Sequence, residues 1–234
     1  MTFVLVHGGG MTGGCWAPLV PLLDGPVHAI DLPGRGRRPA DPAAVTLTDF
    51  VDAVVDDLVA ADLHDVVLVG HSLAGITLPG VARGQRARLR RLVFVSCAVP
   101  PAGESVNRIL ATLSPAAAEI VDRLGADVLG ADGTLSDALA RPMFGNDLDD
   151  DQWAFVRTCM VPEANQVIDE PTDVRVPEDL PRTYVRLLQD ASLTLATQDQ
   201  MIANLGGAEV VDLDAGHMAM ISQPAALASL LNAL

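Results

Sequence analysis

Six short β-rich runs, separated by segments with helical patterning, constrain the fold of this 234-residue chain more than any other feature of its sequence. Strands that alternate with helices pair in parallel, because the helix carries the chain back to the start of the next strand through a right-handed crossover. The sequence therefore predicts an α/β fold with a doubly wound, mostly parallel sheet of about six strands. The runs are Phe3–Val6, Val27–Ile30, Val66–Val69, Leu92–Val95, Thr183–Leu188 and Glu209–Leu213.

Two of the intervening segments carry clear helix signals. Apolar residues recur at helical spacing over Leu47–Ala61 with aspartates largely on the other face, and Thr46 with Asp49 has the pattern of a capping box. The C-terminal segment starts near Pro224, which suits a first helical turn, and then repeats leucine at helical spacing. Each of these segments is therefore predicted to be a helix.

More than eighty residues without a clear strand separate the fourth run from the fifth. Within this interval Ala116–Leu124 and Asp150–Val156 have helical patterns, and Pro and Gly residues lie between them. We expect a helical insertion over one end of the sheet, of the kind that forms a lid. The predicted division is a core of residues 1–98 and 182–234, with a helical lid segment at 99–181 inserted between core strands.

The stretch VVLVGHSLAG, residues 66–75, holds the strongest catalytic signal. A buried-strand run ends at Gly70, and Ser72 follows just before the small residues Ala74 and Gly75. Strand, sharp turn and helix in this order form a nucleophile elbow, which presents a serine hydroxyl at the top of the sheet. Small residues flank the serine because the turn brings two backbones close together. Ser72 is thus the predicted nucleophile, and the alternative is a serine at an ordinary helix N-cap.

A serine hydroxyl needs a base, and the base needs an acid that orients it. His217 lies in a Gly-His loop after the last predicted strand and is the best placed of the five histidines. Asp190 ends the preceding strand and completes the chain order Ser, Asp, His. Asp199 is the rival acid, whereas Asp214 lies too close in sequence to His217 to approach its ring easily from the far side. We predict that Ser72, Asp190 and His217 are catalytic.

The glycine-rich stretch after the first strand admits two interpretations. Residues 8–13 match G-x-G-x-x-G, a dinucleotide-binding turn, and Asp31 lies where that fold places its ribose-binding acid. Alternatively, the loop provides an oxyanion hole. The prolines in the following CWAPLVPLL favour the second interpretation, because an interior proline costs a helix about 3 kcal/mol or more. We therefore predict that the backbone N–H groups of Gly9 and Leu73 bind the developing oxyanion.

Charge and composition argue against several other functions. All 15 basic residues are arginine and face 30 acidic residues, a net charge of −15, so nucleic acids and anionic membranes should repel the chain. Without lysine there is no P-loop lysine and no lysine Schiff base. The three cysteines are far apart and lack C-x-x-C spacing, which favours neither disulfides nor a zinc site. With no signal-like or membrane-spanning run in the sequence, we expect a cytoplasmic protein.

The motifs LVHG, IDLPGRGR, GHSLAG and GHMAM together resemble those of the α/β-hydrolase superfamily, and more narrowly its small lid-bearing branch of plant methylesterases, hydroxynitrile lyases and bacterial esterases. The matches extend from Val4 to the C-terminal helix and are weakest in the lid segment. This resemblance implies the same nucleophile, acid, base and oxyanion donors, with no metal and no organic cofactor. The lyases carry threonine and lysine where this chain has Gly8 and Met218, which favours an esterase.

The predicted function is that of a serine hydrolase that cleaves a small to medium carboxylic ester or lactone through an acyl-enzyme on Ser72. Candidates for the substrate pocket are Trp16, Phe144, Trp153 and Met218. The alternatives are a ligand-binding, receptor-like protein, or a lyase, cyclase or cofactor-free oxygenase on the same scaffold, with a nucleotide-binding oxidoreductase ranked last. The sequence leaves both a monomer and a homodimer open.

Overall fold

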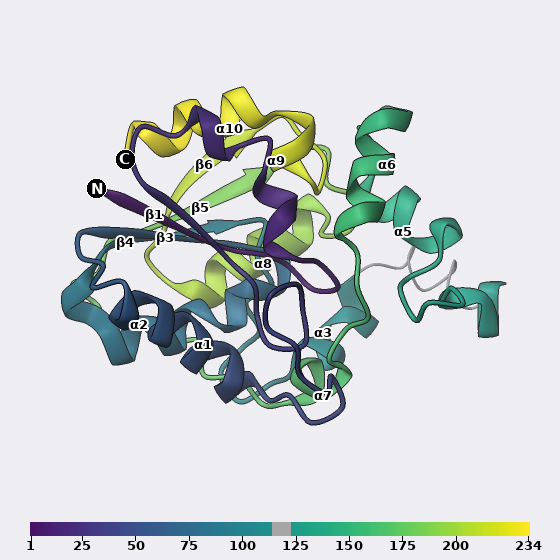
Figure 1. Cartoon of the computed structure of the whole chain (residues 1–234), viewed down its shortest axis with the longest axis horizontal. Coiled ribbons are helices and arrows are strands. Elements are labelled where there is room, and N and C mark those ends of the chain that lie inside the picture. Colours follow the sequence, from purple (N-terminus) through teal and green to yellow (C-terminus); the bar gives the residue numbers. More distant parts are fainter. Residues whose placement is uncertain (114–122) are drawn as a thin grey trace.

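A six-stranded parallel sheet forms the centre of the computed structural model, which describes residues 1–113 and 123–234 (Figure 1). The strand order is β2-β1-β3-β4-β5-β6, and every neighbouring pair is parallel. Each predicted run overlaps one strand, so the predicted α/β class is confirmed. The strands are β1 (Thr2–Val6), β2 (Val27–Ile30), β3 (Val66–His71), β4 (Leu89–Val95), β5 (Arg182–Leu187) and β6 (Glu209–Leu213).

Helices cover both faces of the sheet (Figure 1). On one side the hydrophobic cluster includes α1 (Leu47–Ala60), α2 (Leu78–Gln85), α3 (Val106–Leu113), α7 (Asn165–Asp169) and α8 (Leu195–Leu205). The opposite cluster includes α5 (Asp137–Phe144), α6 (Asp150–Cys159), α9 (Ala219–Ser222) and α10 (Pro224–Asn232). Short 3₁₀ helices are η1 (Gly13–Trp16), η2 (Val20–Leu22), η3 (Ser72–Ile76), η4 (Arg86–Arg88) and η5 (Gly125–Val128). Within the described residues, no helix is long and apolar enough to cross a membrane.

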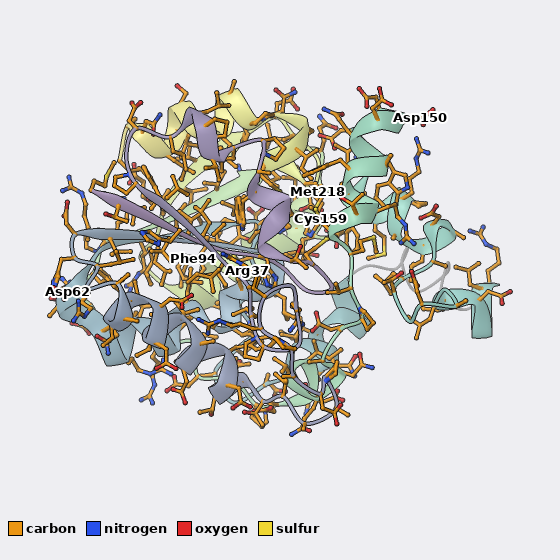
Figure 2. The ribbon with its side chains drawn as sticks, viewed as in Figure 1. Arg37, Asp62, Phe94, Asp150, Cys159 and Met218 are labelled. Carbon is orange, nitrogen blue, oxygen red and sulfur yellow. The ribbon has the colours of Figure 1, made fainter. Side chains whose placement is uncertain are left out.

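Burial on both faces explains why the inner strands are rich in apolar residues. Successive side chains of β1 alternate, with Val4 and Val6 in one hydrophobic cluster and Phe3 and Leu5 in the other. Figure 2 shows where apolar and acidic side chains lie. Phe94 of β4 lies in the interior, whereas Asp62 and Asp150 project at the periphery. The core therefore forms two layers, one on each side of the sheet.

The helix predicted at Leu47–Ala61 is confirmed as α1, including its start. The Thr46 hydroxyl accepts a hydrogen bond from the Asp49 N–H, and the Asp49 carboxylate accepts one from the Thr46 N–H. This reciprocal capping satisfies two backbone donors that a helix N-terminus leaves free. The C-terminal helix is likewise confirmed as α10, which starts at Pro224.

The lid segment runs from β4 to β5 and extends beyond one end of the sheet (Figure 1). The helix predicted at Asp150–Val156 is confirmed as part of α6, whereas the one predicted at Ala116–Leu124 lies almost wholly outside the described residues. An isolated antiparallel bridge joins Met160 to Met11, next to the glycine loop of the core. The exact division into core and lid remains a prediction.

Candidate active site

Ser72 lies at the sharp turn between β3 and α2 and has a backbone φ of +52°. Left-handed backbone is uncommon in residues other than glycine, costs about 1–3 kcal/mol, and clusters at functional sites. Small neighbours make this turn feasible: a Cβ on Gly75 would lie 2.3 Å from the Ala98 carbonyl oxygen, and one on Gly70 would lie 2.6 Å from Leu78 Cδ1. The predicted elbow geometry is therefore present.

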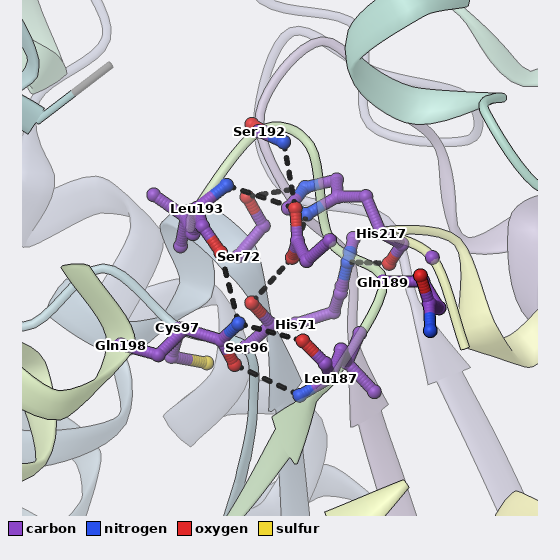
Figure 3. Close-up of polar contacts among 12 residues, drawn as sticks. His71, Ser72, Ser96, Cys97, Leu187, Gln189, Ser192, Leu193, Gln198 and His217 are labelled. Carbon is purple, nitrogen blue, oxygen red and sulfur yellow. Dashed lines mark hydrogen bonds and ion pairs between the residues drawn. The ribbon is translucent and has the colours of Figure 1, made fainter. Parts of the chain in front are cut away.

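The loops after β3, β5 and β6 bring Ser72, Asp190 and His217 into one hydrogen-bonded chain (Figure 3). His217 Nε2 is 3.1 Å from Ser72 Oγ, and His217 Nδ1 is 2.7 Å from Asp190 Oδ2. Because the Asp190 carboxylate accepts a hydrogen bond from the Nδ1–H, Nε2 carries no proton and can accept a hydrogen bond from the Ser72 hydroxyl. This arrangement allows His217 to act as a base toward Ser72.

The Asp190 carboxylate accepts hydrogen bonds on both oxygens. Oδ2 also accepts from Ser96 Oγ at 2.6 Å, while Oδ1 accepts from the N–H groups of Ser192 and Leu193 at 2.7 and 2.8 Å (Figure 3). Burial works against ionisation of this carboxyl, but the charge and hydrogen bond of His217, together with these donors, outweigh burial and lower its pKa. Asp190 therefore stays ionised beside His217.

The two other acidic residues weighed from the sequence are engaged elsewhere. Asp199 accepts a hydrogen bond from Arg186 Nη1 at 2.6 Å. Asp214 accepts one from Gln189 Nε2 at 3.0 Å. Asp190 is thus the one of the three that contacts His217.

His71, whose contribution was not foreseen from the sequence, holds the backbone of His217. Burial lowers its pKa to about 3, so the ring is neutral. Its Nε2 lies 2.9 Å from the carbonyl oxygen of His217 and donates to it (Figure 3). The two rings lie 4.6 Å apart between centroids, and Phe144 stacks on His217 at 5.2 Å. His71 occupies the variable position of the elbow motif, so no local pattern marks it.

The glycine loop, residues 8–10, is held by another buried neutral histidine. Burial lowers the pKa of His7 to about 4. Its Nε2 accepts from the Leu32 N–H at 3.1 Å, so its Nδ1 carries the proton and donates to the Gly8 carbonyl at 2.8 Å. Because that carbonyl and the Gly9 N–H belong to one trans peptide unit, His7 also sets the direction of the Gly9 N–H.

The two predicted oxyanion donors line the same cavity as Ser72. Gly9 and Leu73 are close neighbours, since a Cβ on Gly9 would lie 3.1 Å from Leu73 Cδ2. Within residues 1–113 and 123–234, neither N–H has a protein hydrogen-bond partner. Both donors are therefore free to bind a substrate oxygen.

Asp31 has a structural role that differs from ribose binding. Its carboxylate accepts from the Gly13 N–H at 2.8 Å and from the backbone N–H and Nε of Arg37 at 3.0 Å. The segment after the glycines is the single 3₁₀ turn η1, which is too short to be the helix of a dinucleotide fold. These contacts favour the oxyanion interpretation of the loop.

A cavity of about 660 Å³ opens over Ser72 and His217. Phe144 and Met218 line it, as predicted, with mainly apolar residues of the lid segment. The prediction is wrong for the two tryptophans, which pack in the core. Trp16 is fully buried with its ring edge-on to that of His71, and Trp153 lies against Gly145, whose Cβ would be 2.7 Å from Trp153 Cε3.

Comparison with known proteins gives a consistent picture. A model described as the alpha/beta hydrolase family matches residues 3–230. A carbendazim-hydrolyzing esterase of Nocardioides sp. (strain SG-4G) is 28% identical over 99% of this chain and 98% of its own. Methylesterase 18 of Arabidopsis thaliana is 26% identical over 95% and 92%.

Solved structures agree with this family. An extracellular alpha/beta-hydrolase from a Paenibacillus species superposes with a TM-score of 0.80 at 26% identity, covering 99% of this chain and 97% of the other. Polyneuridine aldehyde esterase superposes with a TM-score of 0.77 at 21% identity over 98% and 97%. At that lower identity the likeness concerns the fold.

Proposed function

The chain belongs to the alpha/beta hydrolase family, and from this premise we propose that it is a serine hydrolase that cleaves a small to medium carboxylic ester or lactone. The observation that carries the proposal is the chain of hydrogen bonds from Ser72 through His217 to Asp190 beside the cavity. The esterases among its relatives support the same reaction class. Ser72 is the nucleophile, His217 the general base and Asp190 the orienting acid.

Acylation follows from this geometry. Ser72 Oγ attacks the ester carbonyl carbon while its proton moves to His217 Nε2. The negative charge that develops on the carbonyl oxygen is held by the N–H groups of Gly9 and Leu73, and such a donor contributes about 2.7–4 kcal/mol to the transition state. The ionised Asp190 stabilises the imidazolium as it forms.

Collapse of the tetrahedral intermediate breaks the bond to the alcohol, which takes the proton from His217 Nε2. Water then attacks the acyl carbon, with its proton passing to His217, and Ser72 leaves with that proton as the acid is released. For a lactone, alcohol and acid are the two ends of one product. Apart from this water, the groups that act on the substrate are side chains and backbone N–H groups of the chain.

The mainly apolar cavity supports an uncharged, small-molecule substrate as partner. Two of its lining residues adjoin His217: Phe144 stacks on the His217 ring, and Met218 follows His217 in sequence. A cytoplasmic location also belongs to the proposal and is supported by the three buried free thiols, Cys15, Cys97 and Cys159. A monomer and a homodimer both remain compatible with this function.

Substitution of Ser72 tests the proposal with short-chain aryl esters of increasing acyl length. Ser72→Ala should reduce kcat by at least about a thousandfold, because nucleophile and base act as a unit. The matched control, Ser105→Ala, removes a lid-segment hydroxyl that accepts the Arg108 N–H and should leave turnover unchanged. Undiminished hydrolysis in Ser72→Ala would refute the proposal.

A second measurement separates hydrolysis from the other chemistries of the scaffold. In water enriched in heavy oxygen, hydrolysis through an acyl-enzyme places one solvent oxygen in the acid product. A fluorophosphonate should also label wild-type protein on Ser72, and the Ser72→Ala variant should stay unlabelled. Turnover without solvent oxygen in any acid would indicate a non-hydrolytic reaction instead.

A further inference from the structure

A carboxylate of the lid segment, Glu163, contacts the glycine loop and takes no part in the proposed reaction. Its Oε2 accepts a hydrogen bond from the Gly10 N–H at 2.6 Å, and Oε1 accepts one from the Ala164 N–H at 2.7 Å. A Cβ on Gly9 would lie 2.7 Å from the same Oε2. The carboxylate thus lies directly against the loop that carries the proposed oxyanion donor.

Arg35 of the core is the charged partner of Glu163. Its Nη2 forms an ion pair with Glu163 Oε1, and its side chain is only 2% exposed. Nη1 donates to the Pro33 carbonyl at 2.9 Å, and the guanidinium lies 4.7 Å from the centre of the Phe50 ring. Burial lowers the pKa of Arg35 to about 10, so it stays charged at neutral pH and needs an anion beside it.

The lid segment occupies both polar groups of Gly10. Glu163 accepts its N–H, while the Val161 N–H donates to its carbonyl at 2.8 Å. The pairing continues through the Thr12 N–H, which donates to the Cys159 carbonyl at 3.0 Å. Gly10 has a φ of +61°, a left-handed conformation that glycine adopts readily, so its backbone alone would not hold the loop in one orientation. Residues 159–163 therefore fix both peptide units that flank Gly10.

We propose that Glu163 is a positioning residue: by holding the Gly10 N–H, its Arg35-paired carboxylate fixes the adjoining Gly9 peptide so that the Gly9 N–H faces the substrate oxygen. This inference rests on the proposed hydrolase function. On one side His7 holds the Gly8 carbonyl, and on the other Glu163 holds the Gly10 N–H, so Gly9 is clamped between them. The oxyanion hole is then complete only when the lid segment is packed on the core.

Two substitutions at Glu163 separate its hydrogen bond from its charge. Glu163→Ala removes the acceptor for Gly10 and the anion beside Arg35. Glu163→Gln can keep an acceptor oxygen on the Gly10 N–H, but it removes the charge and the second acceptor, which faces Arg35 and the Ala164 N–H. The control is Asp150→Asn, at the exposed start of α6 (Figure 2). This substitution removes an ion pair with Arg141 inside the lid segment. Neither Asp150 nor Arg141 is among the described residues that line the cavity.

Kinetics should show a transition-state defect. We expect kcat to fall about 10- to 100-fold in Glu163→Ala and less in Glu163→Gln, with KM changed by less than about threefold, because a displaced oxyanion donor acts mainly on the transition state. A trifluoromethyl ketone, which forms a tetrahedral adduct on Ser72, should lose affinity in step with kcat. The uncharged alcohol product, which forms no oxyanion, should bind as tightly as to wild type. Asp150→Asn should match wild type in each measurement.

Hydrogen exchange gives a readout that does not depend on turnover. The peptide that covers residues 8–11 should exchange at least about tenfold faster in Glu163→Ala than in Asp150→Asn, with melting temperatures recorded for both. Unchanged exchange, or faster exchange with an unchanged kcat, would overturn the inference; a general loss of protection would do so too. If wild type itself failed to hydrolyse esters, the proposed function would fall, and the exchange data would still decide whether Glu163 holds the loop.

Discussion

Replacing Asp190 by asparagine should disable the proposed base by reversing the proton arrangement on His217. Oδ1 of Asp190 accepts two backbone N–H groups, from Ser192 and Leu193. An asparagine oxygen would keep these two bonds, so the amide NH₂ would take the place of Oδ2 and face His217 Nδ1. Nδ1 must then accept, which moves the ring proton to Nε2. An Nε2–H that points at Ser72 cannot take its proton.

The expected magnitude follows from the loss of the reactive tautomer. With the geometry kept and the tautomer wrong, kcat should fall by about 10⁴-fold, which corresponds to about 5.5 kcal/mol in the activation free energy. KM should change little, because Asp190 is not among the described residues that line the cavity. The side chain keeps its volume and two of its hydrogen bonds, so the variant should remain folded.

The assay is steady-state hydrolysis of the ester that wild type turns over best, with melting temperatures in parallel. Asp199→Asn is the matched control, since that residue pairs with Arg186 on the protein surface, and it should retain wild-type kcat. A fall of less than about tenfold in a folded Asp190→Asn variant would refute the tautomer argument. A larger loss in Asp199→Asn would show that the acid was misassigned.

Two further predictions concern stability. The pKa of His7 is about 4 in the folded state against about 6.5 when unfolded, so its contribution is complete above pH 6.5 and is lost as the pH falls toward 4. Urea titrations should show that the free energy of unfolding falls by about 2 kcal/mol between pH 7 and 5 because of His7. His71 should add to this loss. A free energy of unfolding that stays constant over this range would contradict buried, neutral histidine rings. In the same titrations, Trp16→Ala should lower the free energy of unfolding by about 3–5 kcal/mol, because it leaves a cavity in the core. A large change in KM with unaltered stability would show instead that Trp16 lines the substrate pocket.

Local patterns were sufficient for the sheet and for the residues of the hydrogen-bonded chain. The four inner strands, β1, β3, β4 and β5, are mostly buried, so each contains a short apolar run that stands out from its flanks. The elbow around Ser72 needs small residues at fixed offsets, and this requirement can be recognised in the local sequence. Asp190 and His217 each follow a strand, and parallel strands end at one edge of the sheet.

What the sequence could not provide depends on contacts between distant segments. Arg35 and Glu163 are 128 residues apart, and neither lies in a pattern that links it to the other. His71 acts through a backbone carbonyl 146 residues away. Trp16 and Trp153 were misplaced because apolar residues of core and cavity wall have the same spacing in sequence, and only packing separates them.

The parallel sheet also bears on how a chain of this kind diversifies. Ser72, Asp190 and His217 each follow the end of a different strand. The register of β3, β5 and β6 within the sheet therefore sets where the three residues lie relative to one another. Much of the cavity wall comes instead from the single insertion between β4 and β5. Under the proposed function, substitutions in this segment should change which molecules fit the cavity without moving Ser72, Asp190 or His217. Recruitment to a new substrate is therefore open to stepwise change, provided that the anchor at Gly10 survives each step.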